Sequence, residues 1–533
     1  MSNADDPRTR FSRPLERPSL SLPPRPGRAA DAPPSAPAEP QPPSPFAPQP
    51  PVPVSNGSEN GGLGRLLGAI AKMLQPKQAA PQPQQPTGPV TATIAEPVIY
   101  TIAVAAMNGD MDGLASQALF KTLEGKAALT VKPLPRPFLL ESPPDAAKTN
   151  AMMINLRHAA AEAGVDMIVW GDVSKEGYRL RFTSANPTDE ERVASFGPAT
   201  RLDFPLKIDD TLATMIYAAV LSAPDGPTPV QRAGVRRLLP PLLPVLDPLA
   251  AKPPVAWSMA QQRTVQLLHG HVCAMVASLV APSQAADWYD KSAVSYRAAE
   301  KRLNPRQDPG WENGLMHKHL AGILMARAER LKDKSQQYLE EAIRSWRSAA
   351  ESLPRTMFPQ EWAAIHSRLG AALYRLDLIT GDSDLLREAL AVLQSAQQVH
   401  TRSEAPAKWA DIMLLIAQIL EVYGDQARNP DVLKRSIDAC RLVLEIRDRD
   451  RTPQAWAKSM NTLGSTMFLL DRHTGGASNL PEAIRVLEEA HAVFVAHNAT
   501  GPAQVAARNL AHARKLSEER RSRHVVDPDW AGR

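Results

Sequence analysis

Apolar residues recur at a fixed interval in the C-terminal half of the chain. A Leu-x-x-Ala-Ile pattern begins at Leu339 and returns, with small variations, at three further leucines, each 47 residues after the one before: Leu386, Leu433 and Leu480. Within each copy the apolar residues lie three and four positions apart, as on one face of an α-helix. A fixed period of this size is typical of a stacked array of helical repeats.

A proline placed shortly before a tryptophan also recurs. The spacing is three residues at Pro254 and Trp257, Pro359 and Trp362, Pro406 and Trp409, and Pro453 and Trp456. Because proline is favoured in the first turn of a helix, each proline should start the first helix of a pair, with the second helix beginning near the repeated leucine. We expect five pairs from Trp257 to about Val495, a closing helix from Pro502 to Leu516, and tryptophans that pack between helices.

Residues 93–225 have a different texture. Short apolar runs at 98–106, 128–134 and 165–173 are typical of buried strands, and the alternating stretch 178–182 is typical of a hairpin partner. Helical stretches separate or follow these strands at 113–123, 147–163 and 210–221. Strands that alternate with helices predict a small α/β domain around a mixed sheet.

Residues 226–254 join the α/β domain to the repeats. Pro240, Pro241, Pro244 and Pro248 are incompatible with one long helix here. We therefore expect an apolar, proline-rich linker that packs along the first repeat and fixes the α/β domain against it.

The N-terminal residues 1–92 are dominated by Pro, Ala, Ser and Gln. Such a segment buries too little apolar area to fold, so we expect a disordered arm with polyproline II character. Residues 62–75 interrupt it with leucines at helical spacing from Leu63 to Leu74, and Arg65 and Lys72 near the polar side. This predicts an amphipathic helix that docks on a partner or a membrane surface; alternatively, it is transient or packs on the folded part of the chain.

Composition narrows the class of protein. A net charge of +5 over 533 residues does not indicate a polyanion-binding protein, so we expect no nucleic-acid partner. The two cysteines, Cys273 and Cys440, lie outside any CxxC spacing, which favours a reducing compartment. The sequence contains no apolar run long enough for a transmembrane helix and does not begin with a secretory signal. We expect a cytoplasmic protein, with a flexible tail at 518–533.

One loop has the pattern of a calcium ligand set. Residues 108–113 place side-chain oxygens at positions one, three and five and glycine at six, as an EF-hand does. Position twelve is Leu119, where the bidentate glutamate should stand. We therefore expect a polar turn between a strand and a helix, with Asp112 as the N-cap.

Histidines cluster at His269 and His271 and again at His317 and His319. His269 and Cys273 lie one helical turn apart, but one pair of ligands does not make a tight metal site. We interpret these histidines as core or groove residues. The sequence contains no recognisable catalytic triad, phosphate-binding loop or cofactor fingerprint, so we expect no catalytic, cofactor or metal site.

The repeats resemble tetratricopeptide repeats. Leu369-Gly370 and Leu463-Gly464 match the Leu-Gly pair on the first helix of that family, with Ile416-Ala417 as a conservative variant, and small residues match on the second helix at Ala389, Ser436 and Ala483. The period of 47, against about 34 in the family, predicts a longer connection between the two helices of a pair. The resemblance implies a right-handed α-solenoid whose first helices line a concave surface.

The family's groove positions, transferred to this chain, give an expected partner-binding set: Tyr374, Asp411, Gln418, Glu421, Lys458, Asn461 and Phe468. The set mixes apolar and charged groups. It lacks the Lys, Asn and Arg pattern that would clamp an acidic C-terminal peptide.

Residues 93–225 resemble the TolB amino-terminal-type domain. The match rests on the stretch 164–173, Gly-Val-Asp-Met-Ile-Val-Trp-Gly-Asp-Val, followed by the hairpin strand at 178–182. In the family, "GVDYVLEGSV…VRV" occupies this place. The usual "LPF" after the first strand is here Val104-Ala105-Ala106. The resemblance implies an accessory domain of the kind that sits beside helical repeats in bacterial cytoplasmic proteins.

The sequence thus predicts a mainly α protein, with a disordered proline-rich N-terminus, a small α/β domain and an α-solenoid of elongated tetratricopeptide-like pairs over 255–517. We expect a non-enzymatic scaffold that binds a protein or peptide on its concave face. The alternative is a regulatory sensor whose α/β domain binds a small ligand and signals through the repeats.

Overall fold

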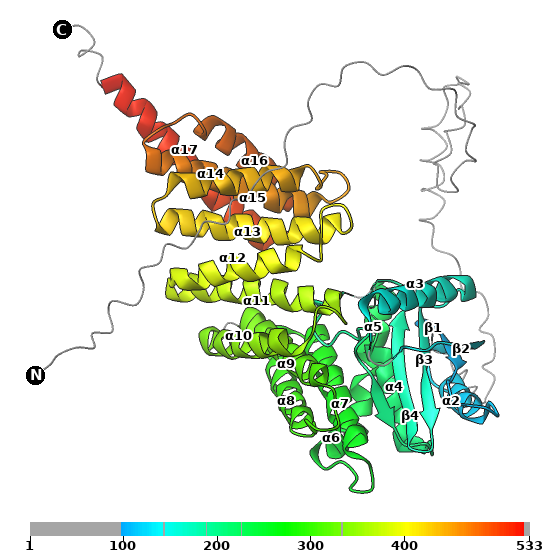
Figure 1. The fold of residues 1–533 in the computed structure, drawn as a ribbon. Helices are drawn as coiled ribbons and strands as arrows, with labels where there is room; N and C mark the ends of the chain where they lie inside the picture. The colour runs from blue at the N-terminus through cyan, green and yellow to red at the C-terminus, as the bar shows by residue number, and fades with distance from the viewer. Residues whose placement is uncertain are drawn as a thin grey trace, which may run out of the picture. The chain divides into compact units, whose positions relative to one another are not determined.

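The computed structural model describes residues 97–526, except 142–143, 188, 225, 227 and 332–333. The chain divides into two units, Met1–Thr91 and Ala92–Arg533. The expected proline-rich arm and the amphipathic stretch 62–75 lie outside the described residues. The described part is mainly helical, with one small sheet before a series of helix pairs (Figure 1). Within it, every helix is too short or too polar to cross a membrane.

Five strands form one mixed sheet in the order β2-β1-β3-β4-β5. They are β1 (Tyr100–Ala106), β2 (Leu129–Pro137), β3 (Met167–Ser174), β4 (Gly177–Ser184) and β5 (Leu202–Phe204). β1 runs parallel to β2 and β3, whereas β4 pairs antiparallel with both β3 and β5. The predicted mixed sheet is confirmed, and β5 is a strand that the sequence pattern did not reveal.

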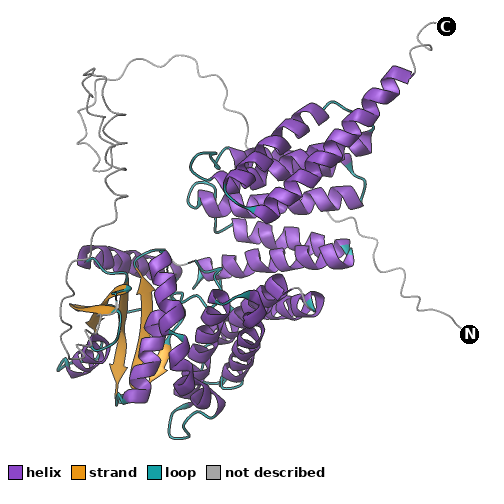
Figure 2. Ribbon diagram, turned by 180° about the vertical axis from the view of Figure 1, so that it is seen from behind, coloured by secondary structure: helices purple, strands orange, loops and turns teal. Residues whose placement is uncertain are grey.

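The two faces of the sheet bury different cores, because successive side chains of a strand point to opposite faces. Ile168 and Trp170 pack on one face against α3 (Ala146–Ala163). Met167 and Val169 face a larger core that continues into the first repeat helices. Figure 2 shows helices on both sides of the orange strands. The helices of the larger core include α2 (Leu114–Glu124) and α4 (Asp210–Ser222).

Helices occupy the segment for which we expected a linker. They are α5 (Pro229–Leu238), the 3-10 helix η2 (Pro240–Leu242) and α6 (Leu243–Ala251). Thr228 caps α5 through a capping box with Gln231, and Pro240 begins the next element because proline fits the first turn of a helix. The prolines keep each helix short without preventing helix formation. The segment packs on the first repeat, where Gln266 donates to the carbonyl of Ala250 at 3.2 Å.

Five helix pairs and a closing helix follow. The pairs are α7 (Met259–Leu279) with α8 (Pro282–Glu300), α9 (Gly310–Leu331) with α10 (Ser335–Ser352), α11 (Pro359–Thr380) with α12 (Ser383–Gln397), α13 (Pro406–Gln426) with α14 (Pro430–Leu444), and α15 (Pro453–Thr474) with α16 (Leu480–Ala496). Pro359, Pro406 and Pro453 are each the first residue of a helix, as predicted. The prediction was wrong at Pro254, because α7 begins only at Met259, where Ser258 forms a capping box with Gln261. The helical repeat architecture is confirmed.

The extra length of each repeat does not lie where we expected it. Only Gly381 and Asp382 separate α11 from α12, so the predicted long connection is wrong. The additional residues lengthen the first helix, which has 22 residues in α11. That helix ends only at Gly381, whose left-handed backbone (φ 70°) is readily adopted by glycine.

The Leu-Gly pair of the first helix marks a close approach of two helices. A Cβ atom on Gly370 would lie 2.6 Å from Cγ of Leu393, and one on Gly464 would lie 2.6 Å from Cγ of Leu487. Any side chain at either position would overlap the second helix. The residue type at this position is therefore dictated by helix packing.

The repeated tryptophans are half-buried. Those of the later pairs lie in the first turn of α9, α11, α13 and α15, whereas Trp257 precedes α7. The guanidinium groups of Arg355 and Arg402 lie 5.5 Å from the rings of Trp362 and Trp409. An arginine one repeat later lies 5.3 Å from Trp456. The repeated tryptophans pack against the apolar core, as predicted, and these three also make a cation–π contact.

The closing helix is longer than expected. α17 (Thr500–Val526) continues past Leu516 into the segment that we expected to be a flexible tail. Residues 517–526 contain neither glycine nor proline, and consist mostly of Glu, Arg and other residues that a helix tolerates. The nearest helix-breaking residue is Pro528, beyond the described part of the chain.

Candidate functional site

An irregular segment between β4 and β5 crosses the first helices of four successive pairs. We call residues 185–201 the strap. Near its start, Asp189 lies 2.8 Å from Nζ of Lys408 on α13. Glu191 then lies 3.2 Å from Nε of Arg368 on α11. Farther along, the strap contacts α9 and α7. A segment of the α/β domain therefore occupies the face that the sequence predicted for a partner.

The middle of the strap inserts an aromatic side chain among buried histidines. The ring of Phe196 meets that of His271 edge-on at 4.7 Å. Nδ1 of His271 lies 2.7 Å from the hydroxyl of Tyr296, and His319 stacks on the same tyrosine. Burial lowers the pKa of His271 to about 3, so the ring is neutral. The interpretation of these histidines as core residues is confirmed.

A buried ion pair lies under the strap. Nζ of Lys318 on α9 is 2.6 Å from Oε2 of Glu361 on α11, and the two side chains are only 4% and 1% exposed. Lys318 also donates to the hydroxyl of Ser195 at 3.3 Å. A Cβ atom on Gly197 would lie 1.7 Å from Oε1 of Glu361, so any side chain there would displace the carboxylate that pairs with Lys318. Charge and shape together fix the strap to the array.

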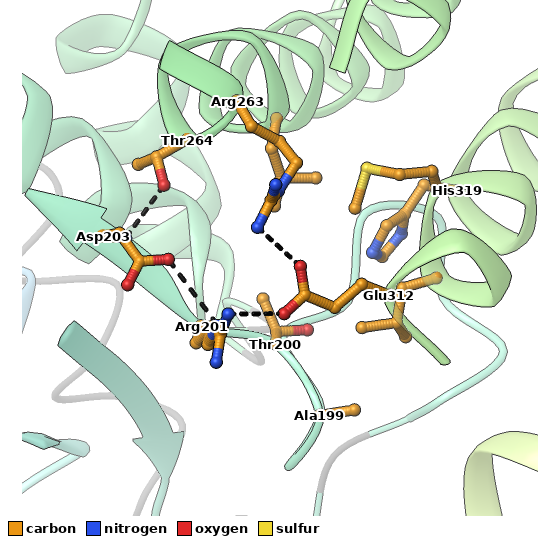
Figure 3. A pocket seen from close by; sticks show the side chains of 11 residues that line it. Ala199, Thr200, Arg201, Asp203, Arg263, Thr264, Glu312 and His319 are labelled. Atoms are coloured by element: carbon orange, nitrogen blue, oxygen red, sulfur yellow. Dashed lines mark hydrogen bonds and ion pairs between the residues drawn. The ribbon is translucent and has the colours of Figure 1, made fainter. Parts of the chain in front are cut away.

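The end of the strap is anchored by a second charged cluster (Figure 3). Glu312 of α9 forms an ion pair with Arg201 at 2.6 Å and accepts a hydrogen bond from Arg263 of α7 at 2.6 Å. The backbone N–H of Asp203 donates to Thr264 at 2.8 Å. The space between these side chains is about 20 Å³, which holds little more than a water molecule. This cluster joins β5 to the first two repeats and leaves no room for a ligand.

A larger cavity, of about 470 Å³, lies where the strap meets α3, α11 and α13. Thr149 and Arg157 of α3, Glu190 of the strap, Glu361 of α11 and Lys408 of α13 are among the residues that line it. Burial and the nearby Glu361 carboxylate raise the pKa of Glu190 to about 7. Small-molecule sites commonly have volumes of about 300–1,000 Å³, so this cavity is large enough for a ligand.

The predicted partner-binding residues on α11 and α13 are mostly covered by neighbouring helices. Tyr374 is half-buried, and burial raises the pKa of its hydroxyl. Gln418 reaches Thr462 of α15 at 3.5 Å. Glu421 accepts from Ser465 of α15, and burial raises its pKa to about 7. These side chains therefore contact other repeats.

On α15 the closing helix covers two further predicted positions. Asn461 accepts from Asn509 of α17 at 3.2 Å, and the ring of Phe468 stacks on His512 at 6.2 Å. Lys458 is exposed, as is Asp411 of α13, which forms an ion pair with Arg447. Of the seven predicted residues, only Asp411 and Lys458 remain exposed, because α17 and adjacent first helices cover the others.

The loop with the calcium-like pattern is held by its own hydrogen bonds. Asp110 accepts from the backbone N–H groups of Ala115 and Ser116 at 3.2 and 2.7 Å. Asp112 accepts from the backbone N–H of Leu114 at 3.1 Å, but the N-cap residue of α2 is Gly113, so the predicted N-cap was wrong by one residue. The left-handed backbone of Gly113 (φ 72°) intervenes just before the helix begins. Within the described ranges, no three His, Cys, Asp or Glu side chains are placed to hold a metal.

His269 and Cys273, one turn apart on α7, also contact other groups of the protein. Nε2 of His269 lies 2.8 Å from Asp247 of α6, and Nδ1 lies 2.7 Å from Ser295 of α8. Sγ of Cys273 lies 3.6 Å from His269. The side chains hold α6 and α8 against α7, in agreement with a core role.

Comparison with known proteins gives little guidance. No family model matches the chain, and no curated protein matches it. Among solved structures, a circular tandem repeat protein with novel repeat topology and enhanced subunit contact surfaces is similar over 60% of this chain and 85% of its own, with 14% identity and a TM-score of 0.25. A similarity this weak carries no argument about fold or function.

Sequence reasoning did not predict the strap. Its residues lack helical or strand periodicity, and the chain there turns at Asp189, Arg192 and Gly197. The available signal was Phe196, a large apolar residue in a polar loop. Such a residue in a loop indicates a contact elsewhere in the fold, although it does not identify the contact.

Proposed function

We propose that this protein is a non-enzymatic scaffold that binds a protein partner through the first helices of its repeat array. The observation that carries the proposal is the strap, an irregular segment held by side-chain ion pairs on the first helices α9, α11 and α13. The ring of Phe196 adds a contact with His271 on α7. A partner segment with similar chemistry would use the same kind of contact. Beyond the strap's contacts, Asp411 on α13 and Lys458 on α15 offer exposed charges of opposite sign.

We propose that the repeats are elongated relatives of tetratricopeptide repeats and that the α/β domain is TolB-like. The close approach at Gly370 and Gly464 supports the first assignment, and the strand and helix order supports the second. Two buried, unpaired cysteines support a cytoplasmic location.

Site-specific cross-linking in the full-length chain tests the proposal. A photoreactive amino acid at Asp411 or Lys458 should cross-link the same partner in cells. The matched control is Arg435, an exposed residue on the second helix α14. Equal cross-linking from Arg435, or cross-linking only from residues before 227, would contradict the assignment of the binding face.

A further inference from the structure

The cavity between the strap, α3, α11 and α13 contains polar groups that the chain leaves unpaired. Thr149 is only 5% exposed, and its hydroxyl has no hydrogen-bond partner among the described residues. Nε of Arg157 likewise has no hydrogen-bond partner among the described residues. Thr149, Met153 and Arg157 are four residues apart in succession, so they form one stripe along α3. Buried polar groups are normally paired, and unpaired ones call for an explanation.

Two helices begin at the cavity wall without a side-chain cap. The N-cap residues are Phe358 for α11 and Ala405 for α13, and neither accepts a hydrogen bond from its helix with a side chain. Both residues line the cavity. The first-turn N–H groups of a helix carry partial positive charge and favour a bound anion.

Two of the charged groups that line the cavity form ion pairs with residues outside its lining. Lys408 is paired with Asp189 at 2.8 Å and Glu191 at 3.7 Å, and Glu361 is paired with Lys318. Arg157 and Glu190 remain and attract each other. Burial raises the pKa of Glu190 to about 7, so part of its charge is lost near neutral pH. Arg157 and the two helix termini are therefore the groups of the lining that favour a bound anion.

We propose that this cavity binds a small organic anion, a carboxylate or phosphate carried on a compact apolar body. The anionic group would accept hydrogen bonds from Arg157 and Thr149, and the apolar body would pack on Met153, Phe358 and Pro198. The ligand would contact the α/β domain and the array together and would stabilise their junction. This proposal is independent of the scaffold function.

Binding of two small anions to the full-length protein tests the site. Benzoate and phenyl phosphate serve as probes, and benzyl alcohol and benzylamine serve as neutral and cationic counterparts of similar size. Affinities are measured by ligand-observed NMR and by the shift in thermal unfolding temperature. At least one anion should bind about tenfold or more tightly than benzyl alcohol, as expected for a charge-assisted hydrogen bond. The tighter of the two anions identifies the site as a carboxylate or a phosphate site.

Three variants locate the binding. Arg157→Gln should weaken anion binding about ten- to a hundredfold, whereas Arg136→Gln, which removes an exposed arginine of the same domain, should leave it unchanged. Ala147→Phe places a ring at an exposed position on the cavity wall and should also block binding. This variant keeps the test valid if Arg157→Gln does not fold.

Three results would overturn the proposal. The first is unchanged anion affinity in both Arg157→Gln and Ala147→Phe. The second is benzylamine binding as tightly as the anions. The third is no binding of either anion at about 1 mM, the weak end of specific small-molecule affinity.

Discussion

Removing Lys318 should destabilise the protein far more than removing an exposed lysine. In Lys318→Met, the carboxylate of Glu361 would remain buried at 1% exposure without its cation, and Ser195 would lose a donor. Breaking a buried ion pair by deleting one partner costs about 3–5 kcal/mol. Exposed pairs contribute about 0–1 kcal/mol. The matched control is Lys434→Met, because Lys434 pairs with Asp431 at the surface, where the side chains are 61% and 86% exposed.

Urea unfolding followed by tryptophan fluorescence measures the free energy of unfolding, and limited proteolysis of the strap reports local release. Lys318→Met should lower the free energy by about 3–5 kcal/mol and expose the strap to protease. The double variant Lys318→Met/Glu361→Leu should recover most of the loss, since an apolar pair of similar size is often tolerated. A loss below about 1 kcal/mol for Lys318→Met, similar to that of Lys434→Met, would refute the argument that this pair is buried and holds the junction.

Three further predictions concern packing, pH and the surface of the array. Gly464→Ala should destabilise the protein by about 1–2 kcal/mol, because its Cβ would lie 2.6 Å from Leu487. In the same urea assay Gly322→Ala, whose nearest contact is at 3.9 Å, should stabilise it by up to about 1 kcal/mol. A shift of the same sign in both variants would contradict the close helix approach at Gly464. Burial raises the pKa of Glu190 from 4.5 to about 7, so the native state binds this proton more tightly than the unfolded state does. The free energy of unfolding should therefore fall as pH rises from about 4.5 to 7, by at most about 3 kcal/mol. Unfolding curves of Glu190→Gln across this range should lack that part of the fall; identical pH dependence in both proteins would show that Glu190 titrates normally. Arg402→Met should cost only about 0.5–1 kcal/mol by thermal unfolding, since the contacts of Arg402 with Trp409 and Glu445 lie near the surface. A loss above about 2 kcal/mol would contradict the exposed position of this arginine.

In the α/β domain, local sequence patterns predicted β1 and β3 but missed β5. The apolar runs at 98–106 and 165–173 became β1 and β3, because short apolar stretches bounded by turns have few other structures available. β5 escaped prediction because it is only three residues long and pairs with a single strand. Its position depends on the contact between Asp203 and Thr264, 61 residues away.

The candidate site was predicted less well than the fold. Transferring groove positions from a resembling family assumes that the face is open, but α17 covers Asn461 and Phe468, and adjacent helices cover most of the rest. The junction cavity was not predicted because its lining comes from α3, the strap and two repeats. No local pattern links such distant segments.

The sequence by itself determined the repeat period, the starts of α11, α13 and α15 and the close helix approach, because each depends on residues within one repeat. Pro359, Gly370 and Leu386 act through the backbone limits of proline, the small size of glycine and helical periodicity. Only the tertiary structure decided that the strap covers the array. The strap's contacts join residues as distant as Asp189 and Lys408, 219 positions apart. Such a contact requires both domains to be folded, and its energy comes from burial and charge pairing that no single segment contains.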